Sequence, residues 1–183
     1  ETVRRGMEQV LKGQTITRVD QRREGLRMPF PAGLAAALEG HKIIHFGRRA
    51  KYILMQIEGG QTVVLHLGMS GRILLLAAGQ DYAPQKHDHL ILEFKGGARM
   101  VFTDPRRFGM VMLANDNELD SLPAFASLGP EPLDNAFSGP VLHNKLKNKK
   151  TSMKAALMDQ RVVAGLGNIY VCEALYFAGI HPE

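Results

Sequence analysis

The stretch YILMQIEGGQTVVLHL, residues 52–67, indicates the fold class of this chain. Residues 52–57 and 62–67 are both rich in aliphatic and β-branched side chains, and Gly59 and Gly60 stand between them. Such runs are typical of strands, and a glycine pair between two of them is typical of a tight turn. The stretch therefore predicts a β-hairpin.

Further apolar runs lie on both sides of this hairpin. We expect strands over residues 14–20, 43–46, 72–76, 90–94, 99–103 and 110–113, with a second tight turn at Gly96-Gly97. Apolar residues at helical spacing predict a helix from Val3 to Leu11, ended by Gly13, and a shorter helix over residues 34–39. The first part of the chain is therefore expected to be β-rich, with helices beside the strands.

The composition changes after Leu113. Residues 115–140 are rich in Asp, Asn, Ser, Pro and Gly, which predicts a linker. Beyond it, helical spacing predicts three helices over residues 140–147, 151–159 and 168–178. We expect a β domain over residues 1–125 and, over residues 126–183, a linker followed by a helical domain.

Charge and cysteine content narrow the class of protein. The 183 residues carry 23 Lys and Arg against 18 Asp and Glu, a net charge of +5 that favours a polyanionic partner or merely aids solubility. With Cys172 as the single cysteine, neither an intrachain disulfide nor a cysteine zinc site can form. No apolar run is long enough for a membrane span, and residues 1–6 lack a signal core. We therefore expect a cytoplasmic protein without a membrane partner.

Two basic segments are candidates for phosphate binding. Arg48, Arg49 and Lys51 stand just before a predicted strand. A second tract holds Lys145, Lys147, Lys149, Lys150 and Lys154, with no acid among them. Lysine and arginine contacts to phosphate supply much of the affinity of proteins for DNA. The alternative for each segment is a solvated charged surface.

Two predicted turns carry side chains that are costly to expose. In residues 65–71, Gly68 and Gly71 flank Met69, which is either an apolar wedge between bases or a core residue. In residues 103–109, an Asp-Pro pair precedes Arg106, Arg107 and Phe108. Arg106 could replace a displaced base and Phe108 could stack, or the turn is a charged hairpin with a buried Phe.

Two further segments suggest ligands. In residues 86–89, His87 and His89 would point the same way on a strand, but without a converging third ligand a metal is disfavoured against a phosphate contact or a surface role. In residues 164–170, a glycine-rich turn leads into the last helix, with Asn168 as its expected N-cap. This helix start is either a phosphate site or a plain capped helix. The third glycine of a dinucleotide fingerprint is absent.

Five segments, taken together and in this order, resemble formamidopyrimidine-DNA glycosylases. They are RRAK at 48–51, HLGMSG at 66–71, DPRRFG at 104–109, LGPEPL at 128–133 and GLGNIY at 165–170. The resemblance implies an α+β fold, in which an antiparallel β-sandwich is followed by a helical domain with a helix–two-turns–helix motif and DNA lies in the cleft between them. It also implies removal of oxidised purines, such as 8-oxoguanine and ring-opened purines, followed by cleavage of the abasic strand.

The resemblance also implies roles for individual residues. Lys51 corresponds to the lysine of strand cleavage by β-elimination, which contacts phosphate beside the lesion. DNA contacts are implied for His66, His87, Arg106, Lys149 and Asn168, and Lys154 corresponds to a residue near the lesion pocket. Met69, Arg106 and Phe108 correspond to the residues that fill and flank the gap left by the flipped base. None of these positions is a metal ligand.

Two parts of the family pattern are absent from residues 1–183. Family members begin Pro-Glu-Leu-Pro-Glu-Val directly before the segment that starts here at Glu1, and this proline and glutamate are the nucleophile and the acid/base. They end with a four-cysteine zinc finger. We therefore expect a chain truncated at both ends and inactive as it stands, with zinc bound only in the full-length protein. The implied partner is double-stranded damaged DNA, and the implied state is a monomer.

Two other functions compete with this interpretation. The sibling endonuclease VIII group prefers oxidised pyrimidines, but residues 104–109 favour the formamidopyrimidine branch. A non-catalytic nucleic-acid-binding module is the alternative from another class, because the expected DNA-facing residues outnumber the catalytic ones.

Overall fold

Residues 52–67 form the predicted hairpin in the computed structural model, which describes residues 1–183. Strand β3 (Tyr52–Ile57) pairs antiparallel with β4 (Gln61–His66), in a register that runs from Tyr52 opposite His66 to Ile57 opposite Gln61. Side chains alternate along β3, so that Ile53, Met55 and Ile57 are buried and their neighbours are not. This is the pattern of a strand with one face on the core.

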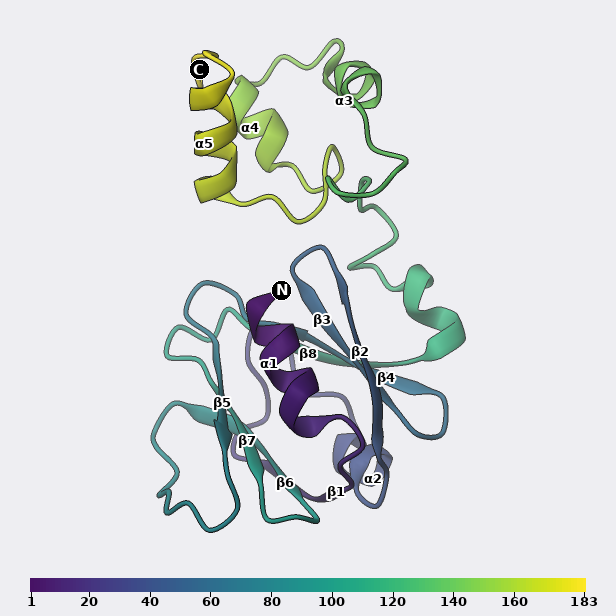
Figure 1. The fold of residues 1–183 in the computed structure, drawn as a ribbon, viewed down its shortest axis with the longest axis vertical. Helices are drawn as coiled ribbons and strands as arrows, with labels where there is room; N and C mark the ends of the chain where they lie inside the picture. The colour runs from purple at the N-terminus through teal and green to yellow at the C-terminus, as the bar shows by residue number, and fades with distance from the viewer. The chain divides into compact units, whose positions relative to one another are not determined.

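This hairpin belongs to one of two four-stranded antiparallel sheets (Figure 1). One sheet has the order β1 (Ile16–Gln21), β6 (Asp88–Phe94), β7 (Arg99–Thr103) and β5 (Arg72–Leu76). The other has the order β2 (Ile43–Arg49), β3, β4 and β8 (Met110–Asn115). Every predicted strand is confirmed, with ends that differ by a few residues.

Two helices complete the core of the β part. Helix α1 (Thr2–Leu11) buries Met7 and Leu11, and α2 (Leu34–Leu38) buries Leu34 and Leu38. These side chains join one hydrophobic cluster with Phe46 and residues of both sheets. Burial of an aliphatic side chain of this size contributes about 1.5–3 kcal/mol, so the apolar face of each helix holds it on the sheets.

The chain divides into two units. The first unit holds Glu1–Arg48 and Tyr52–Leu119, and the second holds Arg49–Lys51 with Asp120–Glu183. The short segment 49–51, from the last residue of β2 to the start of β3, thus belongs to the second unit, which residue order alone does not suggest. The boundary that we expected between residues 125 and 126 stays a prediction.

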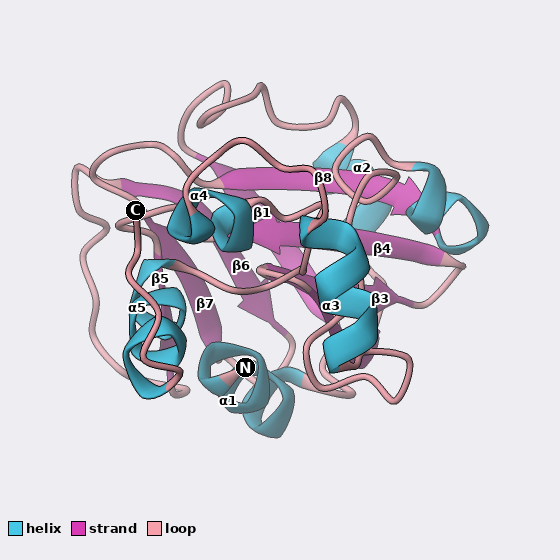
Figure 2. Cartoon of the chain, turned by 90° about the horizontal axis from the view of Figure 1, so that it is seen from above, coloured by secondary structure: helices cyan, strands magenta, loops and turns pink.

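The second unit is helical, as predicted, and Figure 2 draws its helices in cyan. It contains α3 (Gly139–Leu146), α4 (Met153–Met158) and α5 (Asn168–Phe177), with α4 beside α5. Leu157, Val171 and Leu175 form a small buried cluster between α4 and α5. No helix of the structure is both long and apolar enough to cross a membrane.

The linker predicted over residues 115–140 stays a prediction, but two parts of this segment are ordered by hydrogen bonds. Residues 116–121 form a 3-10 helix, and the Gly129 N–H donates to the Gln160 carbonyl at 2.8 Å. A Cβ at Gly129 would lie 2.6 Å from the Arg161 carbonyl oxygen, so only glycine fits there. A polar, glycine-rich composition is shared by linkers and by loops whose backbone is bonded to a domain, and composition does not separate the two.

A buried carboxylate fixes the start of β6. Asp88, 2% exposed, accepts hydrogen bonds from the Tyr82 hydroxyl at 2.7 Å, the Gln85 N–H at 2.6 Å and the Thr103 hydroxyl at 2.5 Å. Burial alone would raise the pKa of Asp88, but these bonds outweigh it and lower that pKa. Burial and the bond to Asp88 raise the pKa of Tyr82 to about 12.

Replacement of Asp88 by Asn should lower the free energy of unfolding at pH 7 by roughly 1–3 kcal/mol, because an amide cannot accept all three bonds. The folded-state pKa is depressed, so the stabilisation is present above the unfolded value of about 3.9 and is lost as pH falls through the folded value. In urea unfolding, the gap between parent and Asp88→Asn should therefore be widest near neutral pH and shrink in acid. Asp81→Asn, an exposed change in the same loop, is the control.

Candidate nucleic-acid interface

Met69 stands at the tip of a turn on the first unit. The turn follows β4 and is closed by the Gly71 N–H, which donates to the Leu67 carbonyl at 2.8 Å. Gly68 has φ +62°, and a Cβ there would lie 2.6 Å from the Phe108 carbonyl carbon. Only glycine therefore lets this turn lie against residue 108. Met69 is 76% exposed, so the alternative of a core methionine is wrong.

Asp104 holds this turn to the next one. Its side chain is fully buried, with one carboxylate oxygen accepting from the Ser70 hydroxyl at 2.6 Å and the other from the Gly109 N–H at 2.7 Å. The Arg106 N–H in turn donates to the Ser70 Oγ at 3.2 Å. Asp104 thereby closes its own turn, residues 104–109, and ties it to the turn of Met69.

The second turn presents a cation stacked on an aromatic ring. The Arg106 guanidinium lies 4.7 Å from the centroid of the Phe108 ring, and Phe108 is 44% exposed. A hairpin with a buried Phe is therefore the wrong alternative. Exposed Met69 and Phe108 would cost less if they packed between bases, and Arg106 beside them would face phosphate or a base edge.

His66 lies at the end of β4, directly before the Met69 turn. The Gly68 N–H donates to the His66 Nδ1 at 3.1 Å, so in the neutral ring the proton is on Nε2. The Tyr52 ring stands 4.9 Å away, tilted by 45°. The imidazole is thus oriented and offers an N–H donor of the kind that binds phosphate.

His87 and His89 do not act as the expected strand pair. Strand β6 begins at Asp88, and its pairing with β7 shifts register between Asp88 and Leu90. His89 is fully buried and its Nε2–H donates to the Asp104 carbonyl at 2.9 Å, which supports the turn of Arg106. His87 is half-buried and is the one of the two that remains a candidate for DNA.

The structure has no group of three or more His, Cys, Asp or Glu side chains placed to hold a metal ion. The chain also has a single cysteine, so the four-cysteine zinc site of the resembling family does not fit residues 1–183.

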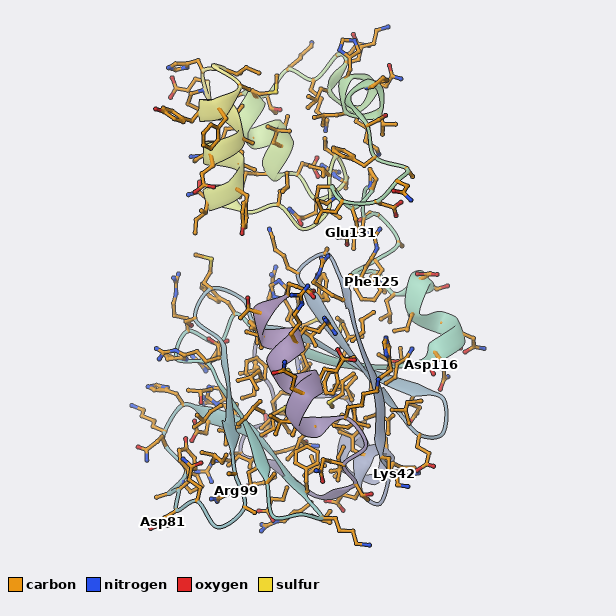
Figure 3. The ribbon with its side chains drawn as sticks, viewed as in Figure 1. Lys42, Asp81, Arg99, Asp116, Phe125 and Glu131 are labelled. Carbon is orange, nitrogen blue, oxygen red and sulfur yellow. The ribbon has the colours of Figure 1, made fainter.

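In the second unit, a carboxylate holds the segment that carries Lys51. Glu131, which is labelled in Figure 3, accepts from the Arg49 guanidinium at 3.0 Å and from the Ala50 N–H at 2.5 Å. Ala50 has φ +51°, a left-handed conformation that such a bond helps to maintain. Arg48 forms an ion pair with Glu1 at 3.3 Å. Both arginines of this basic segment are thus in ion pairs with carboxylates, and Lys51 is its candidate for phosphate.

Lys51 approaches the start of α5. A Cβ at Gly167 would lie 3.7 Å from the Lys51 Nζ, so the ammonium stands beside the helix N-terminus. Gln160 shapes this turn, because its Oε1 accepts from the Gly165 N–H and its Nε2 donates to the Leu166 carbonyl, both at 2.9 Å. Burial lowers the pKa of Lys51, and a bound anion would oppose that shift.

Asn168 is not the N-cap that we expected. The N-cap is Gly167, in extended conformation with φ −124°, and no side chain caps α5. Asn168 is instead the exposed first residue of the helix, and its Oδ1 accepts a weak bond from the Cys172 thiol at 3.7 Å. The first N–H groups of the helix are therefore left for another acceptor, as in helix starts that bind anions.

Lys149 and Lys154 lie in different surroundings. The Lys149 Nζ is 3.2 Å from an Asp159 carboxylate oxygen, and Arg161 shares that carboxylate at 2.9 Å. Hydrogen bonds from Arg161 and Lys149 lower the pKa of Asp159. Lys154 is half-buried in α4 and lines an open pocket of about 400 Å³ together with Met158. Lys149 thus has a structural role in this conformation, and Lys154 faces an open space.

The sequence did not identify three residues that shape the candidate site: Asp104, Glu131 and Gln160. Each side chain bonds to backbone N–H groups and sets the shape of a turn. Asp104 carried a signal, because an Asp before a Pro often bonds to the backbone of its own turn. Glu131 lies in the segment 128–133 that carries the family resemblance, but its partner Ala50 is 81 residues away, so no local pattern indicates the bond. The Gln160 side chain bonds to nearby Gly165 and Leu166, but Gln160 stands in no motif that predicts these bonds.

Comparison with known proteins gives matches along nearly the whole chain. The model of the formamidopyrimidine-DNA glycosylase N-terminal domain matches residues 1–111, and that of the formamidopyrimidine-DNA glycosylase H2TH domain matches residues 128–183. Formamidopyrimidine-DNA glycosylases of Dinoroseobacter shibae and Gluconobacter oxydans are 53% and 51% identical over 100% of this chain. The chain spans 66% of the length of each of these relatives.

Solved structures agree with this result. The Lactococcus lactis Fpg in complex with abasic-site DNA is 33% identical, with a TM-score of 0.91, and covers 100% of this chain and 67% of its own. The same protein in complex with DNA that contains an oxidised pyrimidine matches with the same identity and TM-score.

Replacement of Asp104 by Asn should loosen both turns, because an amide NH₂ group would face either the Gly109 N–H or the Ser70 hydroxyl. We expect a loss of roughly 1–3 kcal/mol in the free energy of unfolding, as for a buried donor left without an acceptor. Hydrogen exchange at the Gly109 amide should become faster. Ser70→Ala removes one bond only and should cost less; an Asp104→Asn variant as stable as the parent would contradict this role.

Proposed function

Because the chain belongs to the formamidopyrimidine-DNA glycosylase family, we propose that it is the β-sandwich and helical part of a base-excision repair enzyme. The enzyme removes oxidised purines, such as 8-oxoguanine, from double-stranded DNA and then cleaves the abasic strand. The observation that carries the proposal is the pair of turns tied by Asp104, which presents Met69, Arg106 and Phe108 together.

The first step is access to the damaged base. A base inside a duplex must leave the stack before an enzyme reaches its glycosidic bond, at a cost of a few kcal/mol. Met69 and Phe108 offset this cost by packing into the gap, and Arg106 takes the place of the displaced base. The bonds of Asp104 matter here because a wedge that moves freely would lose entropy on binding.

The second step is a grip on phosphate beside the lesion. Lys51 and the N-terminal N–H groups of α5, with Asn168, form one anion site within the second unit. His66, His87 and Lys149 bind other phosphates, and Lys149 must leave Asp159 to do so. Lys154 borders the space for the damaged base. We also propose that the β domain ends at residue 125 and that the linker and helical domain begin at residue 126.

The chemistry needs an amine that residues 1–183 do not supply. In the family pattern, the secondary amine of an N-terminal proline attacks the sugar carbon, the base leaves, and a Schiff base forms. The imine acidifies the neighbouring sugar proton, whose loss expels the 3′ phosphate. Lys51 beside that phosphate stabilises the departing charge. We place the activity in the bacterial cytoplasm, in a monomer whose zinc is held by residues outside this chain.

A second candidate substrate is an oxidised pyrimidine, the preference of the endonuclease VIII group. The observation that favours it is the solved complex of the Lactococcus lactis Fpg with DNA that contains such a base. Rates of base release from a panel of duplexes, each with a single purine or pyrimidine lesion, distinguish the two candidate substrates. A non-catalytic DNA-binding module would bind the same duplexes without forming a Schiff base.

Borohydride trapping tests the proposed reaction, because it captures the Schiff base. A protein in which Pro-Glu-Leu-Pro-Glu-Val precedes Glu1 should form a covalent adduct with an 8-oxoguanine duplex, whereas the 183-residue chain should not. Lys51→Ala in the extended protein should slow strand cleavage by at least tenfold, the usual size of a lost charge contact in a transition state. Its affinity for an abasic duplex should change less. Lys42→Ala is the control, and wild-type cleavage by Lys51→Ala would refute the role of Lys51.

Replacement of Met69 or Phe108 by Ala should reduce affinity for an abasic duplex more than affinity for undamaged DNA. The reason is that only the damaged duplex opens a gap, and filling it is worth a few kcal/mol. Competition binding with both duplexes measures the ratio. Equal losses on the two duplexes would point to a folding role for these residues.

A further inference from the structure

A cationic pocket on the first unit has no part in the function described so far. Its volume is about 730 Å³ and it is open to solvent. The pocket is lined by the loop 22–29, which follows β1, and by Lys86 and Arg107. The charged side chains on its wall are Arg22, Arg23, Arg27, Lys86, Arg107 and, as the one acid, Glu24.

Most of these cations have no acidic partner. Arg22 lies 3.7 Å from Asp20, a pairing that is weak and partly exposed. Arg23, Arg27, Lys86 and Arg107 form no ion pair within the protein and are exposed. Like charges around one pocket repel each other, and this repulsion destabilises the folded state unless an anion is present. Several arginines elsewhere are paired with carboxylates, as Arg49 is with Glu131.

The loop that carries the pocket is held in shape. The Leu26 N–H donates to the Met28 carbonyl at 2.9 Å, and the Phe30 N–H donates to the Glu24 carbonyl at 2.8 Å. Leu26 packs on the main core. Lys86 is also held, because Asp88 binds the Gln85 N–H and the Asp104 N–H donates to the His87 carbonyl at 2.9 Å. The backbone that carries the cations therefore needs little reordering when a ligand binds.

The pocket adjoins the turn of Arg106 and Phe108. The Arg27 N–H donates to the Gly109 carbonyl at 3.2 Å, which fixes the loop to the end of that turn. Arg107 has φ +60°, a left-handed conformation. Arg106 stacks on Phe108, whereas its neighbour Arg107 lines the pocket. The pocket therefore lies next to the turn that carries Arg106 and Phe108.

We propose that this pocket is a second phosphate site, which binds the DNA backbone next to the base step that Met69, Arg106 and Phe108 open. The inference rests on the proposed function and extends it to a strand segment outside the gap. Its ligand is the sugar-phosphate backbone, because the wall offers point charges and forked guanidinium donors without a buried polar group that would select a base or a small molecule. Contacts of this kind are independent of sequence and of damage.

The double variant Arg23→Ala/Lys86→Ala tests the site. Binding is measured on a duplex of about 24 base pairs, roughly 80 Å long at 3.4 Å per pair, in abasic and undamaged forms across a salt series. We expect both affinities to fall by the same factor, roughly tenfold at about 0.1 M salt, and the slope of log K against log salt to lose about 2 units. Equal loss on both duplexes separates this site from the wedge, whose loss is specific to damage.

The matched control is Lys42→Ala/Lys95→Ala, which removes the same charge from the same unit. Lys42 (Figure 3) and Lys95 lie on either side of Thr15, before the start of β1, whereas the pocket follows its end. The six residues of β1 span about 20 Å, beyond the screening length of about 10 Å at 0.1 M salt. The control should keep its affinity within twofold.

Two outcomes would overturn the inference. Parental affinity and salt slope in Arg23→Ala/Lys86→Ala would show that the pocket does not meet DNA, and an equal loss in the control would show an effect of net charge alone. Thermal unfolding of each variant separates loss of the site from loss of the fold. If the parent chain bound neither duplex, the proposed function would fail together with this inference. If the parent bound DNA and the variant bound it equally well, only this inference would fail.

Discussion

The buried carboxylate of Asp104 is the constraint on which the candidate DNA surface depends. It accepts from a hydroxyl on one turn and from a backbone N–H on its own turn, so it sets the spacing of two loops that are far apart in sequence. A buried carboxylate is stable only when such donors surround it, and each lost bond leaves a charged group without compensation. The same turn receives support from His89 through the Asp104 carbonyl. Met69, Arg106 and Phe108 are thus exposed on a rigid base.

In the second unit, hydrogen bonds from side chains to the backbone likewise fix the segments around Lys51. Glu131 bonds to the Ala50 N–H and to Arg49, and Gln160 bonds to the backbone on both sides of the turn before α5. Lysine has a long side chain with many rotamers, so its useful geometry comes from the backbone that carries it. The Lys51 ammonium lies beside Gly167 at the helix start, where a Cβ would be 3.7 Å from its Nζ. The helix terminus and the cation then attract the same anion.

The distribution of charge separates cations that hold the fold from cations that face outward. The net charge of +5 says little by itself, because Arg48, Arg49 and Lys149 are all in ion pairs with carboxylates. The cations of the pocket at loop 22–29 lack such partners, with the exception of Arg22. Cations without partners on a rigid loop are a stronger sign of a polyanionic ligand than an excess of lysine and arginine in the composition.

The sequence by itself determined the strands, the helices and the family, because these follow from local patterns of apolar side chains, glycines and short motifs. It also indicated Lys51, Met69, Arg106 and Phe108 as candidates for contact with DNA. It misjudged Asn168 as the N-cap and His87 and His89 as a strand pair. Only the tertiary structure decided these points, and it alone revealed Asp104, Glu131 and Gln160 as the residues that hold the turns. The physical reason is that a hydrogen bond between distant segments leaves no periodic mark in either one, whereas the burial of one face of a strand or helix does.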